Sequence, residues 1–169
     1  MRCPPPTRKR DTPVLVLDTA TRKSAVWIST RLREVDNQEV AAATGAKPKD
    51  AVPLSFDISR ECFMIRPSGA DNPFAIVGTV AAGAVRGEKN IGVIWMLATD
   101  EIEDNAFAFA RFSNPLAVRL LEPYDATMNY VWSKNERHLR WLKWAGFTIL
   151  EPKPHGPFNE LFHPFYMIK

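Results

Sequence analysis

Four of the five residues at positions 100–104 are acidic, directly after the apolar run Ile91–Ala98. No glycine lies between Gly92 and Gly146. A bound diphosphate needs free backbone N–H groups at a helix N-terminus and glycines that let the backbone approach. This segment has carboxylates and no glycine, and carboxylates stabilise the N-terminus of a helix, where the helix dipole is positive. The segment therefore predicts the start of a helix on a solvated face and not a phosphate-binding loop.

Basic residues recur at every third position from Lys134 to Lys143. Such a stripe is typical of a solvated helix face, whose long side chains also cover apolar surface. Two tryptophans lie beside it in the sequence, and exposed aromatic side chains next to arginine are typical anchors of protein interfaces. The candidate partner surface consists of Arg137, Arg140, Trp141 and Trp144.

Other kinds of reactive site lack their patterns. The two cysteines and three histidines do not have metal-ligand spacing, and no Cys-x-x-Cys or His-Glu-x-x-His occurs. No Gly-x-Ser-x-Gly elbow and no phosphate-binding Gly-Lys-Ser/Thr is present. The sequence therefore predicts no bound metal.

Charge and length predict one domain with an appendage. The chain has 169 residues, and four of its 22 basic residues lie in positions 1–10, together with three consecutive prolines and no acid. We expect an extended arm over residues 1–12 and one domain over residues 13–169. Because the rest of the chain is nearly neutral, contact with nucleic acid is expected only through the arm, if at all. No apolar run approaches the ~20 residues of a membrane helix, so no membrane span is expected.

Apolar periodicity predicts a first strand at 14–17 and then two helical pieces up to Gly45, a natural C-terminal stop. The second piece, Leu32 to Ala43, places Leu32, Val35, Glu39 and Val40 near one face. Residues 48–53 contain two prolines and predict a short helical or irregular connector. The remaining elements are three antiparallel strands, a helix, a strand, a helix and two further strands.

Within this order, the strand ending at Ala98 is apolar on both faces and should lie centrally. The helix that follows should break near Ser113–Pro115. Ser133 should cap the next helix, with Glu136 reaching back to complete a capping box. Pro164 in the last strand favours a bulge or an edge. The fold class is α/β (α+β): a single domain with a mixed, mostly antiparallel central sheet flanked by helices.

This order resembles the GNAT (Gcn5-related N-acetyltransferase) fold. Its most specific segment is Asn135–Phe147, in which an asparagine opens a helix and Gly146-Phe147 opens the next strand. The resemblance implies that Asn135 helps to hold the pantetheine arm of acetyl-CoA. The backbone of Met96, Leu97 and Ala98 would pair with that arm like an added strand. A helix-capping role for Asn135 fits its position equally well.

The chain departs from the GNAT pattern in two places. The glycine-rich loop that follows the fourth strand is missing, and Leu142 stands where a tyrosine commonly protonates the departing thiolate. A general acid must lie within hydrogen-bond reach of its substrate. Tyr124 and Tyr130 are near in sequence, but tyrosines beside apolar runs are usually core residues. No catalytic residue is therefore assigned.

A narrower resemblance covers residues 13–169. The block Leu121–Phe147 resembles the GNAT-like proteins of short-tailed bacteriophages, of the internal virion protein A type. The segment Ile94–Ile102 and the tail Glu151–Met167 fit that group, and Leu32–Pro48 is a weaker match. The resemblance implies a role in phage particle morphogenesis.

Three functions follow as hypotheses. The first is a non-catalytic phage protein that acts in virion assembly or inside the particle, with other virion proteins as partners and no cofactor. The alternative is an acetyl-CoA-dependent N-acetyltransferase with an atypical site. The third is an effector that binds a host protein. All three place the chain in the host cytoplasm, the first also in the virion.

One observation separates the first two hypotheses. An open gap between the strands at Ala98 and Met128 would favour the enzyme, because the pantetheine arm enters there in GNAT proteins. A gap filled by large side chains such as Met96, Phe107 or Trp132 would argue strongly against it.

Overall fold

The computed structural model describes residues 12–82 and 90–169, so the predicted arm lies almost entirely outside the described residues. The strands are β1 (Leu15–Thr19), β2 (Glu61–Pro67), β3 (Ala75–Ala82), β4 (Ile91–Ala98), β5 (Ala126–Trp132), β6 (Thr148–Ile149), β7 (Lys153–His155) and β8 (Glu160–Ile168). The helices are α1 (Arg22–Ser29), α2 (Glu34–Thr44), α3 (Pro48–Ile58), the 3₁₀ turn η1 (Asp100–Ile102), α4 (Ala106–Leu121) and α5 (Glu136–Trp144).

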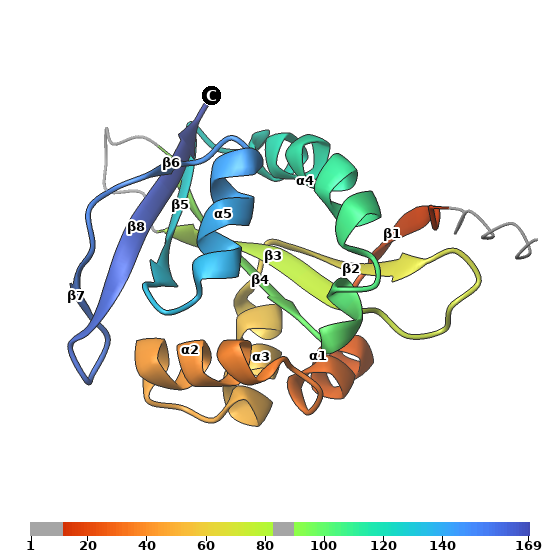
Figure 1. Ribbon diagram of the computed structural model, residues 1–169, viewed down its shortest axis with the longest axis horizontal. Coiled ribbons are helices and arrows are strands. Elements are labelled where there is room, and N and C mark those ends of the chain that lie inside the picture. The colour runs from red at the N-terminus through yellow and green to blue at the C-terminus, as the bar shows by residue number, and fades with distance from the viewer. Residues whose placement is uncertain (1–11, 83–89) are drawn as a thin grey trace, which may run out of the picture.

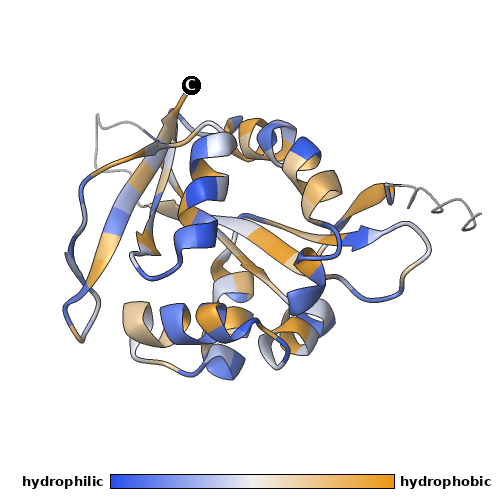
Figure 2. Cartoon of the chain, viewed as in Figure 1, coloured by the Kyte–Doolittle hydropathy of each residue, from blue (hydrophilic) through white to orange (hydrophobic). Residues whose placement is uncertain are grey.

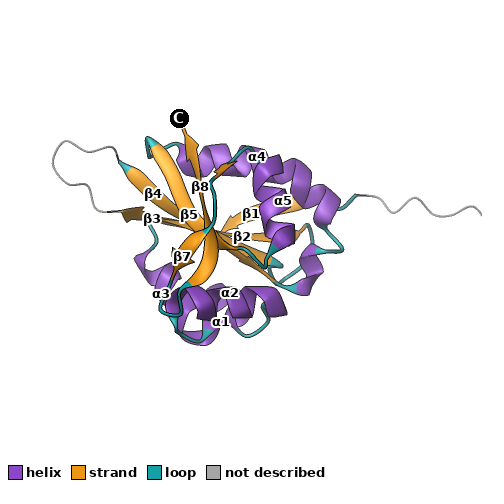
Figure 3. Ribbon diagram, turned by 60° about the vertical axis from the view of Figure 1, so that its left-hand side comes forward, coloured by secondary structure: helices purple, strands orange, loops and turns teal. Residues whose placement is uncertain are grey.

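One mixed sheet separates two layers of helices. The strand order is β1-β2-β3-β4-β5-β8-β6, with β7 also paired to β8. Helices α1, α2 and α3 cover one face of the sheet, and α4 and α5 cover the other (Figure 1, Figure 3). Every neighbouring pair is antiparallel except β4 and β5, which are parallel and joined through α4. The predicted fold class is therefore correct. Within the described residues, no helix combines the length and apolar character needed to cross a bilayer.

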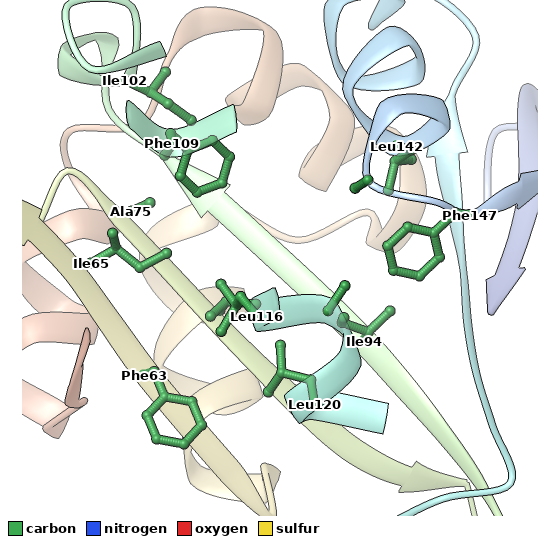
Figure 4. Packing of buried hydrophobic residues seen from close by; sticks show 14 of the residues in the cluster. Phe63, Ile65, Ala75, Ile94, Ile102, Phe109, Leu116, Leu120, Leu142 and Phe147 are labelled. Atoms are coloured by element: carbon green, nitrogen blue, oxygen red, sulfur yellow. The ribbon is translucent and has the colours of Figure 1, made fainter. Parts of the chain in front are cut away.

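Strand β4 is central and contacts both layers, as its unbroken apolar run predicts. Ile94 and Ala98 belong to the core under α4 and α5, with Met96 packed against it. Figure 4 shows Ile94 among the side chains of this core. Trp95 and Leu97 pack against the second core, under α1 and α3. Alternate side chains of a strand point to opposite faces, so one apolar segment serves both cores. Figure 2 shows that the central strands are largely apolar, whereas α5 is largely hydrophilic.

Glycine ends two helices, as the sequence predicts. Gly45 follows α2 with a φ of 73°, and its N–H donates to the carbonyl of Ala41. Gly146 follows α5 with a φ of 99°. Side chains rarely tolerate these left-handed conformations, which glycine adopts at little cost.

Two predictions about helices are wrong, and a third holds only in part. Residues 48–53, predicted as a short helical or irregular connector, belong to an 11-residue helix, α3, and Pro48 stands in its first turn, where the missing N–H costs nothing. Helix α4 runs unbroken through Pro115. Its buried face, which includes Leu116 and Leu120, continues across the proline and outweighs the lost hydrogen bond. The cap of α5 is Asn135, not Ser133, whose buried hydroxyl has no hydrogen-bond partner among the described residues.

Pro164 lies in a strand that has neighbours on both sides, contrary to the expected edge or bulge. Strand β8 has β5 on one side and β6 and β7 on the other. The carbonyl of Pro164 accepts from Leu150 N at 2.8 Å, so its missing N–H lies at the break between β6 and β7. There Nδ1 of His163 lies 2.9 Å from the carbonyl of Leu150 and stands in for the absent donor.

Candidate functional site

A cleft opens in the sheet where β4 and β5 stop pairing. The two strands are paired only from Ile91 to Val93, opposite Ala126 to Met128. Immediately beyond this ladder, Asn129 Nδ2 donates to the carbonyl of Ile94 at 2.7 Å. The side chain of Asn129 thus replaces the next strand-to-strand hydrogen bond and closes the narrow end of the cleft.

The edge of β4 that faces β5 is hydrogen bonded at Ile94 and Ala98 but not at Met96, among the described residues. Alternate residues of a strand direct their backbone groups to the same neighbour, so Ile94, Met96 and Ala98 all face the β5 side. Ala98 N donates to Asp36 Oδ2 at 3.1 Å, and its carbonyl accepts from Arg33 N at 3.0 Å. The backbone of Leu97 lies on the opposite edge, in register with Ile76 of β3. Of the three residues predicted to pair with pantetheine, only Met96 directs a backbone N–H and C=O into the open cleft.

The cleft is hollow on both sides of the sheet. A cavity of about 260 Å³ passes between β4 and β5, from Leu116 and Leu142 on the side of α4 and α5 to Glu39 and Val52 on the side of α2 and α3. A second cavity of about 220 Å³ lies between α4 and α5 and reaches Ala106 at the start of α4. The two cavities share Met96, His138 and Trp141, where they meet.

Large side chains do not close this channel. Met96 lines both cavities without filling them. Phe107 is 67% exposed on the outer surface of α4. Trp132 packs in a separate cluster with Ala42 and Phe162. The gap between the strands is therefore open.

A buried ion pair forms the wall of the cleft at the C-terminal end of β4. Arg33 and Asp36 make a bidentate contact, with Nη2–Oδ1 at 2.7 Å and Nε–Oδ2 at 3.1 Å. Their side chains are 9% and 3% exposed. Burial raises the pKa of Asp36 against the lowering effect of Arg33. Because Asp36 takes up the guanidinium charge, Arg33 is not a free cation facing the cavity.

Glu39 is the carboxylate that lines the cavity through the sheet. It lies one turn after Asp36 on α2, and its oxygens accept from Trp132 N at 3.0 Å and from Asn135 Nδ2 at 2.6 Å. Burial raises the pKa of Glu39 to about 7. His138 Nδ1 is 4.0 Å away, and burial together with Arg33 lowers the pKa of His138 to about 3. At neutral pH the site therefore holds a neutral imidazole beside a carboxyl group that can take up or release a proton.

Asn135 links this cluster to α5. Its Oδ1 accepts from His138 N at 3.3 Å as the helix cap, while its amide nitrogen contacts Glu39 and, at 3.5 Å, Asp36. The side chain is almost completely buried. Direct contact between Asn135 and a ligand would require these hydrogen bonds to be exchanged; in the structure Asn135 caps α5 and donates to Glu39.

The acidic segment after β4 forms a short 3₁₀ turn and not a glycine-rich loop. Thr99 caps η1, and α4 begins at Ala106. The carboxylate of Glu103 pairs with Arg137 of α5 at the mouth of the channel, where the two side chains are 47% and 60% exposed. A polar hollow of about 390 Å³ at this mouth also includes Asp100 and Arg140. Acidic and basic groups thus alternate around the entrance.

The proposed partner surface divides between the exterior and the interior. Trp144 is exposed, and so are Arg137 and Arg140 at the channel mouth. Trp141 instead stacks on Phe109 of α4, with ring centroids 5.3 Å apart, and lines both cavities. Trp141 is therefore part of the channel wall.

The tyrosines and Leu142 also have definite positions. Tyr124 is buried against Gly92, outside the channel. Tyr130 lines the cavity near α2 and stacks on His155, with centroids 3.9 Å apart. Leu142 is 2% exposed and lines the same cavity with an apolar side chain.

The sequence matches no protein-family model and no curated protein. Solved structures do resemble it. AAC(6')-Ib in complex with ribostamycin and coenzyme A has a TM-score of 0.67 and 14% identity over 92% of this chain and 94% of that chain. Spermidine N-acetyltransferase from Vibrio cholerae, with CoA and spermine, has a TM-score of 0.64 and 12% identity over 91% and 95%. An acetyltransferase of the GNAT family from Streptococcus pneumoniae has a TM-score of 0.61 and 12% identity over 91% and 98%. The chain therefore has the GNAT fold.

Sequence reasoning did not assign Glu39 or His138 to a site. One signal was present, because Glu39 shares a helix face with Val35 and Val40, and an acid on a buried face is a candidate for a shifted pKa. His138 gave no such signal. It reaches the cavity only because α5 packs across the cleft.

Proposed function

We propose that this chain is an N-acyltransferase that moves an acyl group from acetyl-CoA to an amine. The observation that carries the proposal is the open channel through the sheet, with the free backbone of Met96 and the carboxyl group of Glu39 on its wall. The structural neighbours whose complexes contain coenzyme A support the same choice of donor.

The channel fits the thioester end of the donor. Met96 offers one backbone N–H and one C=O to an extended arm, as a neighbouring strand would. The indole N–H of Trp141 is buried without a partner among the described residues, and a ligand oxygen would offset that cost. Bound here, acetyl-CoA would supply an activated acyl group.

The entrance fits the diphosphate end poorly. The segment from Thr99 to Asn105 contains no glycine, and the carboxylates of η1 and Glu103 repel an anion at the start of α4. Arg137 offers positive charge but is paired with Glu103. We therefore expect acetyl-CoA to bind weakly, with the apolar channel supplying most of the affinity.

Glu39 provides the proton acceptor that amide formation requires. The acceptor ammonium loses one proton to Glu39, whose pKa of about 7 suits this exchange near neutral pH. The amine nitrogen then bonds to the thioester carbon, and the carbon–sulfur bond breaks with its electron pair on sulfur. The second nitrogen proton passes through solvent to the departing sulfur, because Leu142 has none to give. The products are an amide and a thiol, and Glu39 returns its proton to solvent.

Thiol release and labelled-acyl transfer from acetyl-CoA to a set of primary amines test this function. Glu39→Gln should lower the rate by roughly 10²–10⁴-fold, the usual contribution of a general base. Glu122→Gln, at the exposed C-terminal end of α4, is the matched control and should leave the rate unchanged. Absence of thiol release, together with absence of acetyl-CoA binding by calorimetry, would overturn the proposal.

A second candidate function is a non-catalytic phage component that uses the GNAT fold for its shape. It acts in virion assembly or inside the particle, or binds a host protein in the host cytoplasm. Three observations favour it: the hydrogen-bonded backbone of Ala98, the apolar Leu142 and the acidic entrance. Arg137, Arg140 and Trp144 would then contact the partner.

Two measurements distinguish the two candidates. Calorimetry with acetyl-CoA should show no binding if the protein is only a virion component, and a low-micromolar dissociation constant would exclude that function. Capture of virion or host proteins that is lost in Trp144→Ala but kept in Glu39→Gln would favour it.

A further inference from the structure

The cavity that passes through the sheet ends in an apolar chamber beneath α2 and α3. Its walls there are Val40 and Ala43 of α2, Ala51 and Val52 of α3, and Leu97 of β4. This chamber lies on the opposite face of the sheet from the entrance between α4 and α5. If the donor enters between α4 and α5, the acceptor must occupy this far chamber.

Glu39 is the only carboxylate that lines this cavity within the described part of the chain. Its oxygens hold two hydrogen bonds, from Trp132 N and Asn135 Nδ2. An ionised carboxylate has about four acceptor positions, so it can still accept from one ammonium group.

The other titratable groups on the wall do not oppose a cation. Burial together with Arg33 lowers the pKa of His138 to about 3. Burial, with a smaller effect of Lys153, also lowers the pKa of His155. Both imidazoles are therefore neutral at pH 7. Tyr130 and His155 stack on each other at 3.9 Å and give the chamber an aromatic side.

Chamber size and charge together limit the acceptor. The whole cavity is about 260 Å³, below the range of ~300–1,000 Å³ typical of drug-sized ligands, and part of it must hold the acyl group. One carboxylate balances one ammonium group, and a second buried cation would have no partner. Apolar and aromatic walls favour a hydrocarbon body.

On the basis of the proposed function, we propose that the acceptor is a small primary amine with one ammonium group on an apolar or aromatic body, seated in the chamber beneath α2 and α3 with its nitrogen at Glu39. Polyamines and other polycations are excluded as preferred acceptors. 2-Phenylethylamine represents the proposed class, and spermidine represents the polycations.

Direct binding without a donor tests the inference independently of catalysis. Calorimetry on the full chain should show binding of 2-phenylethylamine, weakened roughly tenfold or more in Glu39→Gln and unchanged in the control Glu122→Gln. Spermidine should bind more weakly than 2-phenylethylamine. Ala51→Leu, which fills the chamber and leaves Glu39 intact, should also abolish binding. Circular dichroism and a thermal melt should show that each variant is folded.

The outcomes separate this inference from the proposed function. Tighter binding of spermidine, or equal binding of 2-phenylethylamine to wild type and Glu39→Gln, overturns the inference; no binding of 2-phenylethylamine at all also overturns it. Transfer of the acetyl group to spermidine but not to 2-phenylethylamine overturns the inference and supports the proposed function. Binding of 2-phenylethylamine that depends on Glu39, with neither thiol release from acetyl-CoA nor binding of acetyl-CoA, supports the amine site and overturns the proposed function.

Discussion

Two arginine–carboxylate pairs flank the same cleft and differ almost completely in burial. Arg33 and Asp36 lie inside the molecule, with side chains 9% and 3% exposed. Arg137 and Glu103 lie at the channel mouth, with side chains 60% and 47% exposed. The inner pair also joins two elements, because Asp36 accepts from the backbone of Ala98 at the end of β4. The outer pair bridges the segment before α4 to α5 through side chains alone.

The difference shows that one chemical pairing serves two purposes, according to its solvent exposure. In a low-dielectric interior, removal of one partner leaves a charge that nothing screens, so the inner pair is part of the structure. At the surface, water and salt weaken each charge, so the outer pair contributes little to stability and mainly sets the local potential. Substitutions at the two pairs should therefore differ in both size and kind.

Removal of the inner carboxylate should have the largest effect. Asp36→Ala leaves the guanidinium of Arg33 buried without its partner and Ala98 N without its acceptor. We expect the free energy of unfolding to fall by about 3–5 kcal/mol. Urea denaturation followed by circular dichroism measures the loss.

Glu103→Ala is the matched control at the outer pair and should cost about 1 kcal/mol or less. Equal losses in the two variants would contradict the contrast drawn between the pairs.

The pH dependence of the free energy of unfolding should also come from the buried side of the cleft, where Glu39 lies. The pKa of Glu39 rises from 4.5 to about 7 on folding, so between these values the unfolded chain loses a proton that the folded chain keeps. The contribution of Glu39 to the free energy of unfolding is fully present below the lower pKa and is lost as the pH rises to the upper pKa. The total loss is up to about 3 kcal/mol.

Glu39→Gln should flatten this fall without abolishing it, because the raised pKa of Asp36 acts in the same direction. Urea unfolding at pH values on both sides of the window measures the slope. An unchanged slope in Glu39→Gln would place the titrating group elsewhere.

The smallest effect should come from the exposed pair at the channel mouth, and it concerns the affinity for acetyl-CoA. Glu103→Gln removes a negative charge from the entrance and releases Arg137. Acetyl-CoA should then bind roughly two- to fivefold more tightly at low ionic strength, and added salt should reduce the gain. Calorimetry at two salt concentrations checks this, with Glu122→Gln as the control. Weaker binding in Glu103→Gln would mean that the carboxylate assists the donor.

Much of the fold is readable from local sequence. The apolar run of β4 indicated a central strand, and Gly45 and Gly146 marked two helix ends, because local conformation decides these features. The helix cap was harder, since Ser133 and Asn135 both have suitable side chains. Asn135 is the cap because its amide also donates a hydrogen bond to Glu39, which lies on another helix and 96 residues away in sequence.

The residues of the site were harder to predict from the sequence than the fold. Met96 lines the cleft, but local sequence does not show that Ala98 would be hydrogen bonded to α2. The position of Trp141 also depended on packing, because either face of an isolated α5 accommodates a tryptophan.

By itself the sequence determined the central position of β4, the absence of glycine from the segment after it, and the order of the elements apart from α3 and β7. Each of these follows from side-chain type and spacing within one stretch of chain. Tertiary structure alone decided where β4 and β5 separate, which backbone groups stay free and which carboxyl group is desolvated. Those properties depend on contacts between α2, β4 and α5, which lie far apart in the sequence, so no local pattern encodes them.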